Sequence, residues 1–249
     1  MEDTRLTPFL SILGLLVLWV VAALLTDDAQ LLPTPWALLP KFAQELASGE
    51  LLTHLGATII RVLWAFVLAM SLGTAIGLAM GRSVRLNRWL DPWLVIFLNL
   101  PALVLIVLCY LWIGLTEAAA IIAVTLNKVP NVATVVREGG RALDPALDAM
   151  AQVYRLSWWR RMCHVILPQL APFIAAAARS GVAVIWKIVL VVEFLGRSSG
   201  VGFQIHLYFQ LFDVGMVLVY ALSFIAVMLL VEWLLLQPWE RRTARWRRA

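Results

Sequence analysis

Long apolar runs alternate with short polar segments along the whole chain. A helix that crosses a lipid bilayer needs about 20 mostly apolar residues, and six runs approach or exceed that length. They lie at about 9–25, 56–80, 91–113, 118–136, 170–194 and 214–236. The pattern predicts a single all-α integral membrane domain over 1–249, with six transmembrane helices and a core at about 51–236.

The composition indicates the same class of protein. Of the 249 residues, 62% are hydrophobic and only 14% are charged, whereas a soluble domain carries about a quarter charged residues. The net charge of +5 does not indicate nucleic-acid binding, because the arginines form short patches between the apolar runs. Before the first run stand Glu2, Asp3 and Arg5, not the basic region of a signal peptide. We therefore expect the run at 9–25 to be a retained first helix.

Three glycines in the second run, Gly73, Gly77 and Gly81, are spaced four residues apart. That spacing places them on one face of a helix, where a second helix can approach closely. Tight helix packing is the favoured interpretation, and pore lining is the alternative.

Basic residues near the helix ends predict the orientation, because cytoplasmic loops carry an excess of lysine and arginine. One set of loops holds Arg5, Arg82, Arg85, Arg88, Arg137, Arg141, Arg155, Arg160, Arg161 and the basic tail at 237–249. The opposite loops hold only Lys41 and Arg197. We expect both termini to be cytoplasmic, and an amphipathic helix to lie at the outer surface within about 26–50.

A polar segment at about 140–168 is much longer than a turn between two spans requires. Asp144 and Pro145 predict a helix start, since the carboxylate can cap the helix and the missing proline N–H costs nothing there. Its apolar face would consist of Leu147, Met150, Ala151 and Tyr154. Ser157 predicts a second short helix, which Pro168 would interrupt before the next span. Two interpretations stay open: a helix lying on anionic lipid, or a docking site that fits a groove on a soluble partner.

The most specific stretch of the sequence is VREGGRALDPALDAMAQVYRLSWWRRMCHVILPQLAPFI, and RLNRWLDPWL, LPALVLIVLCYLWIGLTEAA and IVLVVEFLGRSSGVGF accompany it. Together these stretches resemble the permease subunits of bacterial ABC importers. The branch that handles nitrate, taurine and alkanesulfonates is the most similar. The resemblance covers nearly the whole chain from about Leu32.

The resemblance implies a protein of the bacterial inner membrane that is not an enzyme. In this family the polar segment forms a coupling helix, which inserts into a groove on a cytoplasmic ATPase. The implied partners are two copies of that ATP-binding subunit, a second permease in a homodimer, a periplasmic or lipid-anchored solute-binding protein, and membrane lipid. The chain has no GxxxxGK[ST] sequence, so ATP and magnesium would belong to the ATPase and this chain would hold no cofactor. The residues expected to contact the ATPase are Asp148, Ala151, Tyr154, Arg155, Leu156, Ser157, Trp158 and Trp159.

Two departures from the family pattern fall in this segment. Where the family has Glu-x-Ala, this chain has Ala149, Met150 and Ala151, and Asp148 stands one position early as a substitute carboxylate. Arg155 replaces a glycine that would suit a left-handed turn. Arginine in that conformation costs on the order of 1 kcal/mol. Either the turn has a different shape, or a contact with the ATPase compensates for that cost.

Four ionisable side chains lie inside the expected spans: Arg61, Lys128, Arg179 and Lys187. Such groups face protein or a water-filled cavity. We interpret the two arginines as architectural. The lysines are candidates for a translocation pathway that favours a small anionic solute such as a carboxylate or sulfonate, although buried ion pairs with Glu117 or Glu193 are the alternative. The full set of pathway candidates is Lys128, Asn131, Trp186, Lys187 and Glu193.

Two other classes of function fit the sequence less well. A secondary transporter or channel without an ATPase partner would show an inverted repeat and would not need the polar segment. An intramembrane enzyme would need a convergent catalytic or metal-binding set. The three histidines, His54, His164 and His206, are scattered along the chain, so this pattern does not favour an enzyme.

Overall fold

A computed structural model describes residues 6–236, apart from 27 and 29. Arg5 and the basic tail at 237–249, both used above to predict orientation, lie outside the described residues. Every regular element within the described residues is helical. In chain order these are α1 (Leu6–Thr26), α2 (Pro35–Ser48), α3 (Glu50–Arg82), α4 (Val84–Asn99), α5 (Ala102–Ile113), α6 (Glu117–Arg141), α7 (Pro145–Val153), α8 (Trp158–Arg161), the π-helix η1 (Met162–Ile166), α9 (Leu167–Gly196), α10 (Val201–Gln210), α11 (Val214–Val231) and the π-helix η2 (Glu232–Leu236).

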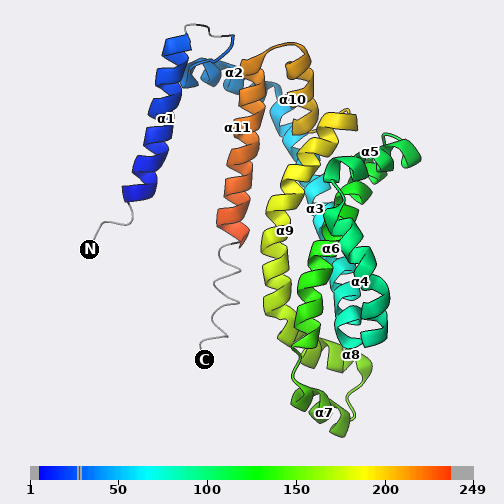
Figure 1. Ribbon diagram of the computed structural model, residues 1–249. Coiled ribbons are helices and arrows are strands. Elements are labelled where there is room, and N and C mark those ends of the chain that lie inside the picture. The colour runs from blue at the N-terminus through cyan, green and yellow to red at the C-terminus, as the bar shows by residue number, and fades with distance from the viewer. Residues whose placement is uncertain (1–5, 27, 29, 237–249) are drawn as a thin grey trace.

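The long helices α3, α6 and α9 form the centre of the molecule (Figure 1). Helices α4 and α5 lie on one side of this centre and α11 lies on the other. Helices α2 and α10 cover one end, here called the α2 end, and α7 and α8 cover the opposite α7 end. Helix α1 stands apart from the centre and is joined to it through α2. The core between the long helices contains Ile185, Trp186 and Tyr220, all buried.

The membrane spans follow the hydropathy pattern, with one correction. In the part of the chain that the structure describes, four helices are long and apolar enough to cross a bilayer: α3, α6, the continuous helix from Trp158 to Gly196, and α11 with the start of η2. Helices α4 and α5 would together make a fifth span, but they meet at an angle of 100°. The apolar part of α1, at Leu10–Thr26, is shorter.

The prediction of a single helix at about 91–113 is therefore wrong. Pro101 disfavours the helical conformation of the residue before it, and Leu100 is extended, with φ −73° and ψ 123°. The chain leaves α4 at this point and begins α5 in a new direction. A hydropathy window does not detect this break, because both halves are apolar.

The glycines of α3 allow close packing on α6. A Cβ atom at Gly77 would lie 2.5 Å from the carbonyl oxygen of Ala133, and one at Gly81 would lie 2.6 Å from that of Arg137. Only a residue without a side chain leaves room for the α6 backbone at these positions. The prediction of tight helix packing is confirmed, and these glycines face α6 instead of a pore.

Pro168 does not interrupt the helix that follows the polar segment, so this prediction is also wrong. Helix α8 continues through η1 into α9, and Pro168 is in the first turn of α9. In η1 the Leu167 amide donates to the carbonyl of Met162, five residues earlier. A π-turn of this kind inserts an extra residue into the helix. It accommodates Pro168, whose missing N–H and ring would otherwise disturb the interior of a continuous helix.

Candidate functional site

The polar segment at 140–168 forms a helix, a tight turn and a second helix at the α7 end (Figure 1). The Asp144 carboxylate accepts a hydrogen bond from the Ala146 amide at 2.8 Å, and Pro145 is the first residue of α7. The Ser157 hydroxyl caps α8 by accepting from the Arg160 amide at 3.5 Å. Both helix starts predicted from the sequence are confirmed.

Arg155 occupies the left-handed region of backbone conformation, with φ 48°. The turn around it is a Schellman motif: the Leu156 amide donates to the Ala151 carbonyl at 2.9 Å, and the Arg155 amide donates to that of Gln152 at 3.0 Å. Glycine is the residue that suits this position. The turn thus has the shape that a glycine would favour, and a different turn shape is excluded. The Arg155 side chain is exposed. A contact with the ATPase is therefore the remaining explanation of how the cost of the left-handed conformation is compensated.

The turn and the two helix ends beside it form an exposed surface, which we call the tip (residues 153–160). Tyr154, Trp158 and Trp159 expose 73%, 70% and 67% of their surfaces. The rings of the two tryptophans lie side by side, with centroids 6.2 Å apart. Among the other expected ATPase contacts, Ser157 is exposed, Leu156 and Asp148 are half-buried, and Ala151 is buried under the turn. Large aromatic side chains at this exposure are typical of a surface that a partner covers.

Asp148 connects α7 to its neighbours. Its carboxylate accepts hydrogen bonds from Arg161 Nε at 2.9 Å and Arg161 Nη2 at 2.5 Å, and from Arg82 Nη2 at 3.2 Å. The hydrogen bond from Arg161 lowers the pKa of the Asp148 carboxyl below its usual value, with Arg82 adding to the effect. This carboxylate therefore holds α7 against α8 and the end of α3.

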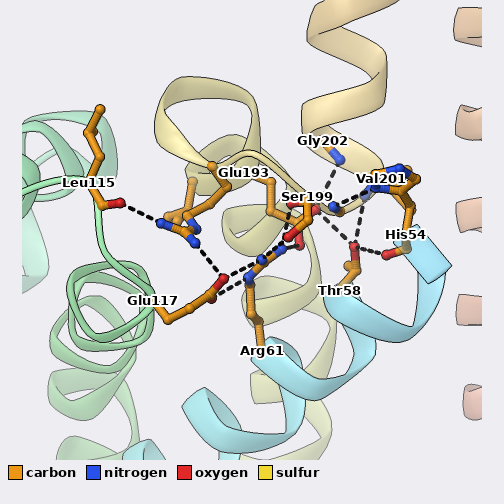
Figure 2. Close-up of polar contacts among 12 residues, drawn as sticks. His54, Thr58, Arg61, Leu115, Glu117, Glu193, Ser199, Val201 and Gly202 are labelled. Atoms are coloured by element: carbon orange, nitrogen blue, oxygen red, sulfur yellow. Dashed lines mark hydrogen bonds and ion pairs between the residues drawn. The ribbon is translucent and has the colours of Figure 1, made fainter.

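At the opposite end, the α2 end, Arg61 organises a second polar cluster, which we call the hub (Figure 2). Its guanidinium donates two hydrogen bonds to Glu117, both at 2.7 Å, and one to Glu193 at 2.6 Å. It also donates to the carbonyl and hydroxyl oxygens of Ser199, both at 2.7 Å. Arg61 is buried, and the planar guanidinium can meet several acceptors at once.

Glu193 of α9 has 0% exposure. Besides Arg61, it accepts hydrogen bonds from the Thr58 hydroxyl and the Gly202 amide, both at 2.9 Å. A side chain at Gly200 would collide with the Glu193 carboxylate, and Gly200 has φ 108°. A buried carboxylate is tolerated when it is paired and hydrogen-bonded in this way. The carboxylate thus fixes the turn between α9 and α10 onto α3.

Arg197 and His54 complete the hub. Arg197 donates to Glu117 and to the Leu115 carbonyl, both at 2.5 Å. His54 Nδ1 accepts from the Gly200 amide at 3.0 Å. Side chains from α3, α6, α9 and the turn before α10 are therefore tied at one point. Within the described residues, no group of three or more histidine, cysteine, aspartate or glutamate side chains could hold a metal ion.

The five pathway candidates are not brought together by a shared contact. Lys128 of α6 has 2% exposure and lies close to Gly181 of α9, where an added Cβ would be 3.3 Å from its Cε. Among the residues that the structure describes, none forms a hydrogen bond or an ion pair with Lys128. Lys187 and Asn131 are exposed on this single protomer. Trp186 stacks on Phe224 at 4.9 Å in the core, and Glu193 belongs to the hub.

Of the four ionisable residues inside the spans, Arg61 has the architectural role expected, and its partners are the two glutamates considered for the lysines. Arg179 is one of the residues lining a cavity of about 490 Å³ between α9 and α11. The contribution of Arg197 and Thr58 to the hub was not anticipated. Their partners lie 80 and 135 residues away in the chain. A pattern within a short stretch of sequence does not predict a hydrogen bond between residues so far apart.

Comparisons with known proteins show what this chain is similar to. Residues 69–237 match the family described as binding-protein-dependent transport system inner membrane component. The chain is 33% identical to the putative aliphatic sulfonates transport permease protein SsuC of Bacillus subtilis (strain 168) over 77% of this chain and 70% of that protein. It is 28% identical to the taurine transport system permease protein TauC of Escherichia coli (strain K12), over 93% of this chain and 86% of that protein. A structure of the MetNI methionine ABC transporter in an inward-facing conformation is similar in fold, with a TM-score of 0.62 and 16% identity, over 76% of this chain and 92% of that one.

Proposed function

This chain belongs to the family of binding-protein-dependent transport system inner membrane components, and we propose that it carries a small anionic solute as one of two identical permeases. Members of this family are the transmembrane permeases of ABC importers and are not enzymes, since ATP hydrolysis takes place on a separate subunit. Membership of this family also excludes a secondary transporter or channel without an ATPase partner. The relatives named for sulfonates and taurine support an anionic solute.

The tip is proposed as the contact with the ATPase, with Tyr154, Trp158 and Trp159 as the anchors. Three large aromatic side chains on a short, well-capped helical turn fit helix-in-groove recognition, and aromatic anchors of this kind dominate the affinity of protein interfaces. Because an ATPase is cytoplasmic, the α7 end would be the cytoplasmic end and the hub would lie near the outer surface. This orientation agrees with the excess of basic residues at the α7 end.

Lys187 supports the assembly of two permeases around a polar path. It is exposed in the single protomer and lies nine residues before the end of α9 at Gly196, which corresponds to about 14 Å along the helix. A lysine facing lipid at depth costs about 2.5–3.5 kcal/mol on insertion scales. A second copy of the chain, enclosing a water-filled path, would remove this cost. The same path could receive the ammonium of Lys128 when α6 and α9 move during alternating access.

The observation that carries the anionic solute is the pair of lysines on spanning helices, one of them buried without a partner among the described residues. The test is uptake of taurine and of a short alkanesulfonate into cells or proteoliposomes that hold the complete importer. Replacing both lysines by methionine should reduce uptake at least tenfold, while the amount of assembled complex stays constant. Lys128→Arg with Lys187→Arg is the matched variant that keeps the charge, and it should retain most of the uptake. Unchanged uptake by the methionine variant would show that the lysines do not serve the solute.

ATP dependence provides the second measurement. Proteoliposomes with this chain, the ATPase and the binding protein should take up solute only with ATP inside the compartment that holds the ATPase. Uptake that persists without ATP and follows an imposed ion gradient would overturn the proposed mechanism.

A further inference from the structure

An apolar cavity of about 770 Å³ lies between the half of α3 nearer the α7 end and the helix that begins at α8. Met70, Thr74 and Leu78 of α3 line one wall, and Met162, Ile166 and Leu167 line the other. These side chains belong to two helices that both qualify as membrane spans. The part of the cavity farther from the α7 end is therefore at the depth of the lipid tails.

The end of the cavity nearest α7, which we call the mouth, has a different chemistry. Arg82, the last residue of α3, lines it together with Trp158 and Arg161. The only acid hydrogen-bonded to these two arginines within the described residues is Asp148, so the mouth has an excess positive charge. An arginine has five N–H donors, and Arg82 gives one of them to Asp148, at 3.2 Å. Donors remain at the mouth for a second anion.

We propose that this cavity binds one anionic phospholipid, with an acyl chain between α3 and α9 and the headgroup phosphate on Arg82 and Arg161. A ligand for this site must be apolar at one end and anionic at the other, and it must lie along the membrane normal. Basic pockets between transmembrane helices bind anionic headgroups in this way, and tryptophan at the mouth suits the interface between lipid and water. A helix from a second permease would fill the apolar part but would leave the arginine donors without an anion.

The position of the site gives it a consequence for coupling. The two arginines at the mouth are the same ones that hold Asp148 of α7 in place, and one wall includes the π-helix η1, a feature often found at functional sites. A phosphate at the mouth would share its arginines with Asp148. The position of the tip would then depend on whether the bilayer supplies an anionic lipid.

The first test measures lipid capture directly and does not depend on any ATPase. The full chain is placed in nanodiscs that contain a photoreactive phosphatidylglycerol or a matched photoreactive phosphatidylcholine, and the crosslinked peptides are identified. We expect phosphatidylglycerol to label the residues of α3 and η1 that line the cavity, about tenfold more than phosphatidylcholine does. Arg82→Gln should reduce this preference by about the same factor, which corresponds to the loss of one charge-assisted hydrogen bond.

Two further variants test whether the labelling comes from lipid inside the cavity. Ala75→Trp fills the cavity from α3 and should abolish labelling by both lipids, whereas Arg85→Gln removes a nearby arginine that does not line the cavity and should change nothing. Equal labelling by the two lipids, or a preference that survives Arg82→Gln, would overturn the proposal. Failure of both lipids to label the residues that line the cavity would overturn it as well.

The second test addresses coupling and is interpreted only when an ATPase co-purifies. ATPase activity of the complex should rise when phosphatidylglycerol is added to phosphatidylcholine nanodiscs, and Arg82→Gln should remove this rise while Arg85→Gln keeps it. An activity that rises equally in the Arg82→Gln complex would separate lipid binding from coupling and overturn the regulatory part of the inference.

Discussion

The hub at the α2 end and the tip at the α7 end are built on opposite principles. In the hub, Arg61 and Glu193 are buried, and each finds several hydrogen-bond partners inside the same chain. In the tip, Trp158 and Trp159 are exposed, and Arg155 is exposed with a left-handed backbone conformation. The main ion pairs of the hub thus form within one protomer, whereas under the proposed function the ATPase would cover the tip. Substitutions should accordingly damage folding at the first end and assembly at the second.

The largest effect is expected from Arg61→Met in the hub. It leaves the carboxylates of Glu117 and Glu193 without their main partner, and breaking a buried pair in this way costs roughly 3–5 kcal/mol of stability. Thermal unfolding of the detergent-solubilised chain, followed by size-exclusion chromatography, measures the loss. Arg88→Met, at an exposed position, is the control. Combining Arg61→Met with Glu193→Met should recover part of the loss, and an unchanged melting temperature in the single variant would contradict this account of the hub.

The next largest effect is expected from Trp158→Ala and Trp159→Ala in the tip. Each should weaken binding to the ATPase by about 2 kcal/mol, or roughly 30-fold in Kd, and leave the melting temperature of the isolated permease unchanged. Trp112 of α5 is equally exposed but is remote from α7, so Trp112→Ala should affect neither quantity. Surface-immobilised permease and purified ATPase give the Kd. A loss of stability without a loss of binding would place the tip among the structural elements.

A smaller effect is expected from Arg155→Gly. Glycine removes the cost of the left-handed conformation, so the turn should gain on the order of 1 kcal/mol, seen as slower proteolysis of α7. Gln152→Gly places the same residue inside the helix and should lose about 1 kcal/mol instead. If ATPase affinity falls while the turn becomes more stable, the arginine is retained for its contact with the ATPase. An unchanged affinity would show that the contact does not compensate for the strain.

The smallest effect is expected from Asp148→Asn, because this ion pair is partly exposed and such pairs contribute at most about 1 kcal/mol. The pKa of Asp148 is lower in the folded chain than in the unfolded one. Its contribution is therefore present at neutral pH and is lost as the pH falls below about 4, toward the folded pKa. Spin labels on Gln152 and on Val84, which begins α4 beside the end of α3, should show α7 moving away from this region in acid. In Asp148→Asn the same movement should already be present at pH 7, while Asp213→Asn at the opposite end should not produce it.

Local features were predictable where a capping residue or a short repeat decides the structure. The caps at Asp144 and Ser157 and the small face of α3 depend on contacts within a few residues or on a repeat of four, and both are confirmed. The single helix at about 91–113 and the interruption at Pro168 were predicted wrongly. In the first case, a proline within an apolar run caused a break of 100°. In the second, a π-turn accommodated the proline without a break.

The sequence by itself determined the membrane class, the positions of most spans, the helix–turn–helix of the polar segment and, by resemblance, the family. These depend on apolar run length, capping and motif order, which are properties of contiguous residues. Only the tertiary structure decided that Arg61 holds Glu117 and Glu193, that Lys128 is buried beside Gly181, and that Arg82 and Arg161 share Asp148. Each of these arrangements forms between residues on different helices, so packing decides it. The low-dielectric interior then strengthens the hydrogen bond between Arg61 and the buried Glu193.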